Sequence, residues 1–173
     1  MSKIFEEMTG YQLMIVWGAA VVAGWLGSQI LASTGYFGAN TVLAITTLWL
    51  IGALIPVIAS YLWTRENDFE WILAIWPAVG VAGILATYAV ALNYLTVNPM
   101  HMYGTFWFVA PAVGFLATVY YVDDWSRNLY LGAALLNLGG AYALLQVPSF
   151  ATYYYTFAAV AQGVPMLVHG YRG

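Results

Sequence analysis

Three long stretches of the chain are almost entirely apolar, and short polar segments separate them. The stretches cover residues 8–64, 71–122 and 128–171, which are 57, 52 and 44 residues long. A helix crosses the hydrocarbon core of a bilayer in roughly 20 residues, so each stretch is too long for one crossing and suits two crossings joined by a tight turn. The pattern therefore predicts an all-α integral membrane protein with six transmembrane helices arranged as three hairpins.

Residues that favour turns divide each apolar stretch near its middle. Gly35, Pro99 and Pro148 stand at these points, where a helix ends readily. A chain of 173 residues holds one six-helix bundle, so we expect a single domain over residues 1–173. The predicted spans are about 11–32, 40–63, 71–94, 103–121, 129–146 and 152–170.

The eleven charged side chains lie in four short clusters outside the apolar stretches. Basic residues in short loops remain on the cytoplasmic side of a membrane. When six crossings are drawn, Lys3, Arg65, Arg127 and Arg172 all fall on one side. We therefore expect a multi-pass protein of the cell membrane with a cytoplasmic N-terminus and a cytoplasmic C-terminus.

Composition excludes several classes of function. Hydrophobic residues make up 63% of the chain and charged residues 6%, whereas about a quarter of the residues are charged in soluble domains. No basic patch is large enough to indicate binding of nucleic acid, and the chain has no cysteine for thiol chemistry. No ionisable residue falls near the middle of a predicted span, which disfavours proton relays and ion-coupled carriers. The sequence indicates no particular cofactor.

Two amide side chains fall near the centre of the last two predicted spans. Asn137 and Gln162 have similar depths in neighbouring antiparallel helices, so we expect their amides to meet. One interpretation is a structural hydrogen bond between helices, worth about 1 kcal/mol. The alternative is that the amides, together with Thr46 and Thr87, orient an uncharged ligand in an apolar cavity.

Prolines recur inside the second helix of each predicted hairpin. Pro56, Pro111 and Pro165 are 55 and 54 residues apart, and this spacing suggests a triplicated hairpin. A recurring Pro-Ala-Val-Gly at 77–80 and 111–114 argues for a different duplication, so both hypotheses stay open. Each mid-helix proline kinks its helix and frees the carbonyl one turn earlier, which either packs against a neighbour or lines a cavity. The freed carbonyls lie near Gly52, Trp107 and Ala161.

Small residues form a stripe along the first predicted helix. Ala20, Gly24 and Gly27 recur at helical spacing, and such a stripe lets another helix approach closely. The approaching helix belongs either to the same bundle or to a partner. A partner of this kind is another membrane subunit or a second copy of the chain, within the lipid bilayer that surrounds both.

One outer loop carries side chains that copper(I) prefers. Met100, His101 and Met102 offer thioether and imidazole groups in succession. Three adjacent residues do not complete a metal site, and no second cluster of Met or His falls on that side. We expect an interfacial turn and no metal.

The layout is similar to that of the substrate-binding subunits of vitamin-uptake transporters of the energy-coupling-factor type. Those subunits also have six helices, a comparable length and small residues on the first helix, and the resemblance implies a transport-type module that works with a partner subunit. The sequence favours a membrane protein that binds or passes an uncharged or amphipathic small molecule. The alternative is a non-catalytic structural subunit of a larger membrane complex, such as a respiratory assembly. A membrane enzyme ranks third, because Walker, dinucleotide-binding and serine-nucleophile motifs are missing.

Overall fold

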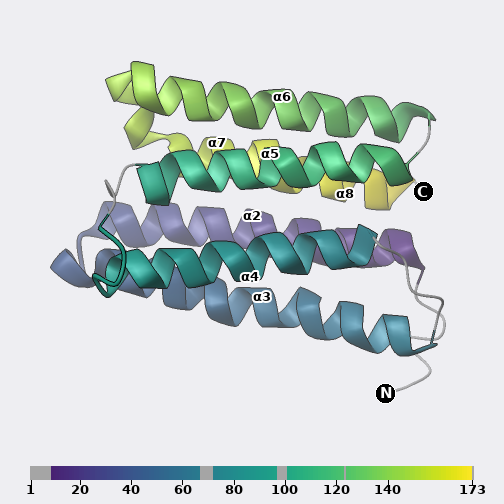
Figure 1. Cartoon of the computed structure of the whole chain (residues 1–173), viewed down its shortest axis with the longest axis horizontal. Coiled ribbons are helices and arrows are strands. Elements are labelled where there is room, and N and C mark those ends of the chain that lie inside the picture. The colour runs from purple at the N-terminus through teal and green to yellow at the C-terminus, as the bar shows by residue number, and fades with distance from the viewer. Residues whose placement is uncertain (1–8, 67–71, 97–100, 123, 173) are drawn as a thin grey trace.

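The computed structural model describes residues 9–66, 72–96, 101–122 and 124–172, and it is helical over nearly all of them. The helices form six rods that alternate in direction along the chain (Figure 1). The first three rods are α2 (Gly10–Thr34), α3 (Thr41–Glu66) and α4 (Ile72–Ala91). The fourth joins a π-helical segment (His101–Thr105), α5 (Phe106–Thr118) and a 3-10 turn (Val119–Tyr121). The fifth is α6 (Asp124–Gln146), and the sixth joins α7 (Tyr154–Ala158), a π-helical segment (Ala159–Gly163) and α8 (Val164–Arg172).

Five of these rods are long and apolar enough to cross a membrane, with mean hydropathies between 1.3 and 2.4. They are α2, α3, α4, the rod that contains α5, and α6. The sixth rod is divided by its π-helical segment into two short helices. The chain is therefore an all-helical bundle with five or six helices suited to a bilayer.

Most helix ends agree with the predicted spans to within a few residues. The largest difference is at α6, which begins at Asp124 rather than near residue 129, because no helix-breaking residue follows Asp124. The helix α4 ends at Ala91, and Asn93 then takes a left-handed conformation with φ of 61°. Asparagine tolerates this conformation better than most residues, which explains why the helix stops there.

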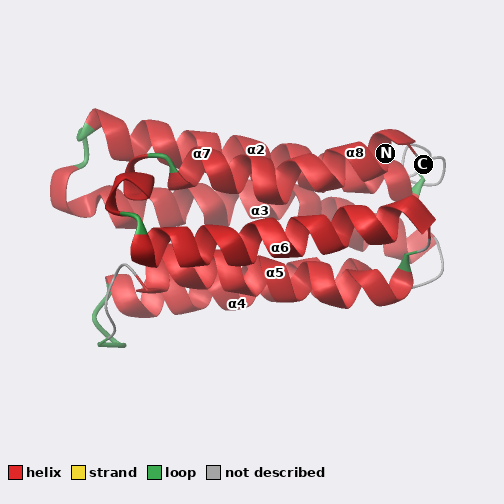
Figure 2. Ribbon diagram, turned by 90° about the horizontal axis from the view of Figure 1, so that it is seen from above, coloured by secondary structure: helices red, strands yellow, loops and turns green. Residues whose placement is uncertain are grey.

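The six rods form a closed ring in which each rod packs beside the next (Figures 1 and 2). The last rod closes the ring against α2, and glycines allow the two backbones to approach. A Cβ atom at Gly170 would lie 2.5 Å from the backbone oxygen of Tyr11. Gly10 and Arg172 therefore lie at one end of the ring, which we call the proximal end (Figure 1). The distal end is the opposite one, with the turns that follow α2, α4 and α6.

The inside and the outside of the ring carry different apolar side chains. The largest side chains on the inside are aromatic, and Phe108, Phe115 and Tyr130 are fully buried there. The outside is largely aliphatic, and Ile51, Ile55 and Leu135 are 61, 65 and 69% exposed. An aliphatic exterior of this extent suits lipid and would aggregate in water.

Candidate ligand-binding site

The amides of Asn137 and Gln162 meet inside the ring, as the sequence predicts. Gln162 donates from Nε2 to Oδ1 of Asn137 at 2.9 Å and to the backbone oxygen of Trp107 at 2.8 Å. Its Oε1 accepts from the indole nitrogen of Trp25 at 2.8 Å. Both protons and the oxygen of the Gln162 amide are therefore engaged within the protein.

Asn137 is engaged in the same way. Its Nδ2 donates to the backbone oxygens of Ala133 at 2.8 Å and Ala161 at 3.2 Å. Ala161 lies one turn before Pro165, just as Trp107 lies one turn before Pro111. The two amides thus satisfy two of the three carbonyls that the mid-helix prolines free. This arrangement agrees with the structural interpretation of the pair, and a ligand-orienting role for Asn137 and Gln162 stays a prediction.

Trp49 on α3 and Trp107 on α5 are each held by the same local motif, which occurs once on α2 and once on α4. The indole nitrogen of Trp49 donates to Oγ of Ser28 at 3.0 Å, and Ser28 donates to the oxygen of Gly24 at 2.8 Å. In the next hairpin the indole nitrogen of Trp107 donates to Oγ1 of Thr87 at 3.0 Å. Thr87 in turn donates to the oxygen of Gly83, four residues earlier, at 2.7 Å. A hydroxyl that bonds to the preceding turn therefore anchors each indole.

The indole rings pack directly against the glycines of this motif. A Cβ atom at Gly24 would lie 2.8 Å from the ring of Trp49, and one at Gly83 would lie 2.5 Å from the ring of Trp107. Neither ring has room for a methyl group beneath it. Each tryptophan is thus fixed twice, by its nitrogen and by the close approach of its ring to a glycine.

The third hairpin holds a related arrangement. Asn137 bonds to the oxygen of Ala133, four residues earlier, and accepts an N–H from Gln162 of the following rod. In all three hairpins, a polar side chain of the first helix bonds to the preceding turn and accepts an N–H from the second helix. The accepting side chains Ser28, Thr87 and Asn137 are 59 and 50 residues apart, so the pattern does not follow the proline spacing of 55 and 54 residues, and both duplication hypotheses stay open.

Near the proximal end the correspondence between the first two hairpins is incomplete. Trp17 donates to Oγ of Ser60 at 2.9 Å, and Ser60 donates to the oxygen of Pro56 at 2.8 Å. Trp76 stands at the matching place in the second hairpin, but its buried indole nitrogen has no partner among the described residues.

A cavity of about 310 Å³ opens on the distal side of the anchored tryptophans, and we call it the distal cavity. The rings of Trp25, Trp49 and Trp107 form one wall of it. Trp49 and Trp107 are stacked with ring centroids 5.9 Å apart, and Trp25 lies edge-on to Trp49 at 4.8 Å. The hydroxyl-bearing residues that line it are Thr46, Thr87, Tyr103, Tyr154 and Tyr155.

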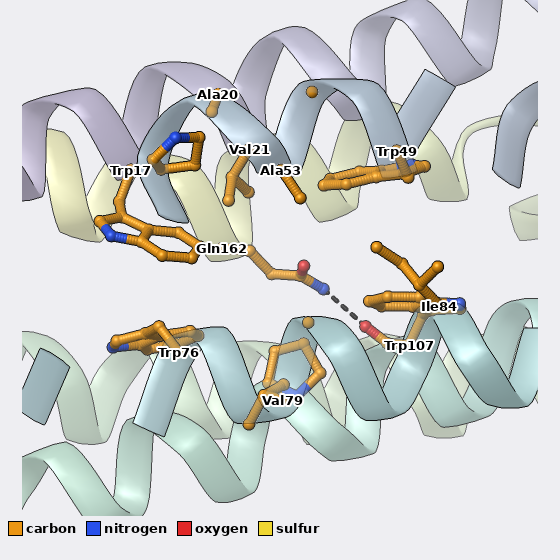
Figure 3. A pocket seen from close by; sticks show the side chains of 14 residues that line it. Trp17, Ala20, Val21, Trp49, Ala53, Trp76, Val79, Ile84, Trp107 and Gln162 are labelled. Atoms are coloured by element: carbon orange, nitrogen blue, oxygen red, sulfur yellow. Dashed lines mark hydrogen bonds between the residues drawn. The ribbon is translucent and has the colours of Figure 1, made fainter. Parts of the chain in front are cut away.

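A second, smaller cavity lies nearer the proximal end, and we call it the inner cavity. It has a volume of about 60 Å³ and lies between Trp49 and Trp107 on one side and Trp17 and Trp76 on the other (Figure 3). Gln162 projects into its middle (Figure 3). Both cavities share Trp49, Trp107 and Ile84, so these three side chains form the partition between them.

The predicted site residues are thus divided between the two cavities. Thr46 and Thr87 line the distal cavity, where each hydroxyl donates to its own helix backbone. Pro56 and Pro111 line the inner cavity with Gln162. Asn137 is fully buried behind Gln162, and Pro165 lines neither cavity.

The small-residue stripe of α2 faces the inside of the same chain. A Cβ atom at Gly24 would meet Trp49 and one at Gly27 would meet Leu48, both on α3. Ala20 lines the inner cavity. These contacts agree with packing inside the bundle, and docking of a partner helix on this stripe stays a prediction.

The weak metal candidates cannot be placed. Met100 lies outside the described residues, as do the side chains of His101 and Met102. Within the described part of the chain, no group of three His, Cys, Asp or Glu side chains is close enough to hold a metal ion.

The clustering of Trp25, Trp49 and Trp107 is not among the predictions made from the sequence. For Trp49 and Trp107 a signal was available, because Ala-Gly-x-Leu-x-Ser/Thr recurs at 23–28 and 82–87, each time followed by a Trp in the next helix. Comparison of the chain with protein-family models, with curated proteins and with solved structures finds no significant match.

Proposed function

We propose that this protein binds an uncharged or amphipathic small molecule with a flat apolar ring in the distal cavity. One observation carries the proposal. The indole nitrogens of Trp25, Trp49 and Trp107 are all engaged by internal hydrogen bonds, so the cavity meets their rings and not their polar edges. Rings held in fixed positions bind a flat apolar partner without losing side-chain freedom on binding.

The size and chemistry of the distal cavity support the same proposal. Its volume of about 310 Å³ is near the lower end of the range for small-molecule sites. None of the described residues that line it is charged, and its polar groups are hydroxyls. A ligand with a net charge would lose its hydration there without gaining a counter-ion.

The proposal includes a position in the membrane. We propose that all six rods cross the bilayer as three hairpins and that both termini lie in the cytoplasm. The distal cavity then lies near the non-cytoplasmic face of the membrane. Arg127 and Arg172 belong to the proximal end, where α3 also finishes with Glu66. Basic residues favour the cytoplasmic side, which supports this orientation.

The alternative function, a structural subunit of a larger complex, has less support. It needs a bundle with a filled centre and a small-residue stripe free to meet a partner. Gly24 and Gly27 instead lie against α3, and the bundle contains two partly open cavities.

Titration with a neutral aromatic probe tests the proposal. We suggest naphthyl propyl ether, measured by calorimetry in detergent with protein-free micelles subtracted. Ile45 lines the distal cavity, so Ile45→Trp should fill it and weaken saturable binding at least about tenfold. Ile51→Trp is the matched control, because Ile51 lies on the same helix and is 61% exposed.

We expect the control to bind the probe as the wild type does. Absence of saturable binding to the wild type would overturn the proposal. Equal loss of binding in both variants would also overturn it, because the site would then not be the distal cavity.

A further inference from the structure

A third space adjoins the distal cavity at the distal end of the ring, and we call it the vestibule. It measures about 400 Å³ and lies between the start of α3 and the end of α4. Val42 and Tyr103 line both the vestibule and the distal cavity, so the two spaces meet at these side chains. The inner cavity, the distal cavity and the vestibule therefore follow one another through shared walls.

The vestibule differs from the distal cavity in its chemistry. Its lining includes the side chains of Asn40, Asn93 and Thr96, whereas the distal cavity is walled mainly by aromatic rings. Asn40 and Asn93 are both exposed, and their amides hydrogen-bond to no described residue. Each amide offers two donors and an acceptor to whatever occupies the vestibule.

Asn93 lines the vestibule at the point where the helix α4 ends. It has φ of 61°, the left-handed conformation that ends α4. Glycine would meet that backbone requirement equally well. The conformation alone therefore does not explain why this position, which lines the vestibule, carries an amide.

Tyr103 stands at the junction of the two spaces. Its ring lines both of them, and its hydroxyl has no hydrogen-bond partner among the described residues. Such a hydroxyl is free to bond to a polar atom at the boundary between an apolar ring and a polar head.

We infer that the ligand is an uncharged amphipathic molecule that bridges the two spaces. Its flat ring lies against Trp49 and Trp107 in the distal cavity, and a head that carries hydroxyl, carbonyl or amide groups lies in the vestibule. Tyr103 and Asn93 bind the head. This inference rests on the proposed function, since it assigns the chemistry of the head to a ligand whose ring the distal cavity holds.

A pair of matched probes tests the inference. Naphthyl glyceryl ether carries two hydroxyls that naphthyl propyl ether lacks, and the two are otherwise alike. After subtraction of protein-free micelles, the wild-type protein should bind the glyceryl ether at least about fivefold more tightly, as expected for a net gain of one or two hydrogen bonds.

The double variant Asn93→Gly with Tyr103→Phe removes the two polar groups and keeps both the backbone conformation and the ring. It should reduce the preference to less than about twofold, because binding of the glyceryl ether weakens more than binding of the propyl ether. Tyr94→Phe is the matched control, since Tyr94 lies in the same turn, is 80% exposed and lines neither space. It should keep the full preference.

The outcomes separate this inference from the proposed function. If both ethers bind equally well to the wild type, or if the double variant keeps the preference, the ligand head does not lie in the vestibule and the inference fails alone. If neither ether binds saturably to the wild type, the proposed function fails and the inference fails with it.

Discussion

Nε2 of Gln162 donates to the backbone oxygen of Trp107 at 2.8 Å, and this is the oxygen that Pro111 leaves without its helical partner. Asn137 does the same for Ala161, one turn before Pro165. An unpaired carbonyl in a bilayer costs several kcal/mol. The two central amides therefore satisfy carbonyls that the proline-containing helices would otherwise bury unpaired, and this explains why neutral polar residues occur at the centre of the bundle.

Removal of the central asparagine should destabilise the bundle. In the variant Asn137→Leu, the oxygen of Ala161 and one Nε2 proton of Gln162 lose their partners. We expect the free energy of unfolding to fall by about 1–3 kcal/mol. Reversible unfolding in mixed micelles of mild detergent and dodecyl sulfate, followed by circular dichroism, measures the change.

The partner variant separates this effect from a loss of packing. Gln162→Leu alone and with Asn137→Leu completes a double-mutant cycle, for which we expect a coupling energy of about 1 kcal/mol. Strictly additive effects would show that the hydrogen bond between the amides contributes nothing.

A methyl group under Trp107 should disturb the distal cavity. In Gly83→Ala, the new Cβ would lie 2.5 Å from the indole ring, so the ring must move. We expect a loss of about 1–3 kcal/mol of stability and a weaker affinity for naphthyl propyl ether. Gly80→Ala is the control on the same helix, because nothing lies within 4 Å of its Cβ position. A Gly83→Ala variant as stable as the Gly80→Ala variant would refute the packing described here.

The hydroxyl of Thr87, which anchors Trp107, should contribute more to the free energy of unfolding than the exposed hydroxyl of Thr47 does. Thr87→Val keeps the shape of the side chain but leaves the indole nitrogen without an acceptor, at a cost of about 1–2 kcal/mol. Thr47→Val removes an exposed hydroxyl that contacts Tyr88 at 3.1 Å, and it should cost less than about 0.5 kcal/mol. The same unfolding measurement compares the two. Equal losses would argue against a special role for the anchor.

The proposed orientation predicts which loops a reagent reaches. The chain has no cysteine, so single cysteines can be added to the natural sequence. In intact cells, a membrane-impermeant maleimide should label Tyr36→Cys at the distal end and label Tyr171→Cys only after the membrane is opened. Both tyrosines are more than 80% exposed, at 84 and 87%. Labelling of Tyr171→Cys in intact cells would show that the C-terminus lies outside the cell and would contradict the proposed orientation.

The helical rods and the meeting of Asn137 with Gln162 could be predicted because one physical constraint decides each of them. Apolar length sets the number of helices, and matched depth in neighbouring antiparallel helices brings the two amides together. Glycine tolerates the left-handed backbone at Gly35, where the sequence predicts a turn. The sequence places the next outer turn at Pro99, which lies outside the described residues, and it does not predict that α4 ends at Ala91, before the left-handed Asn93.

The distal cavity could not be predicted, because it depends on where three indole rings point. Trp25 belongs to α2, Trp49 to α3 and Trp107 to α5, and tertiary hydrogen bonds turn each ring toward the same space. The spacing of tryptophans in the sequence does not contain that information. The ring directions also explain why Thr46 and Gln162 line different cavities, because the stacked rings of Trp49 and Trp107 separate the distal cavity from the inner cavity.

Native mass spectrometry tests most directly whether the distal cavity holds a small molecule. The wild-type protein, purified in mild detergent from the cells that produce it naturally, should carry a small uncharged compound. That compound should be absent from Ile45→Trp and present in Ile51→Trp. A wild-type protein with no bound compound, whether alone or with a second protein subunit, would contradict the account.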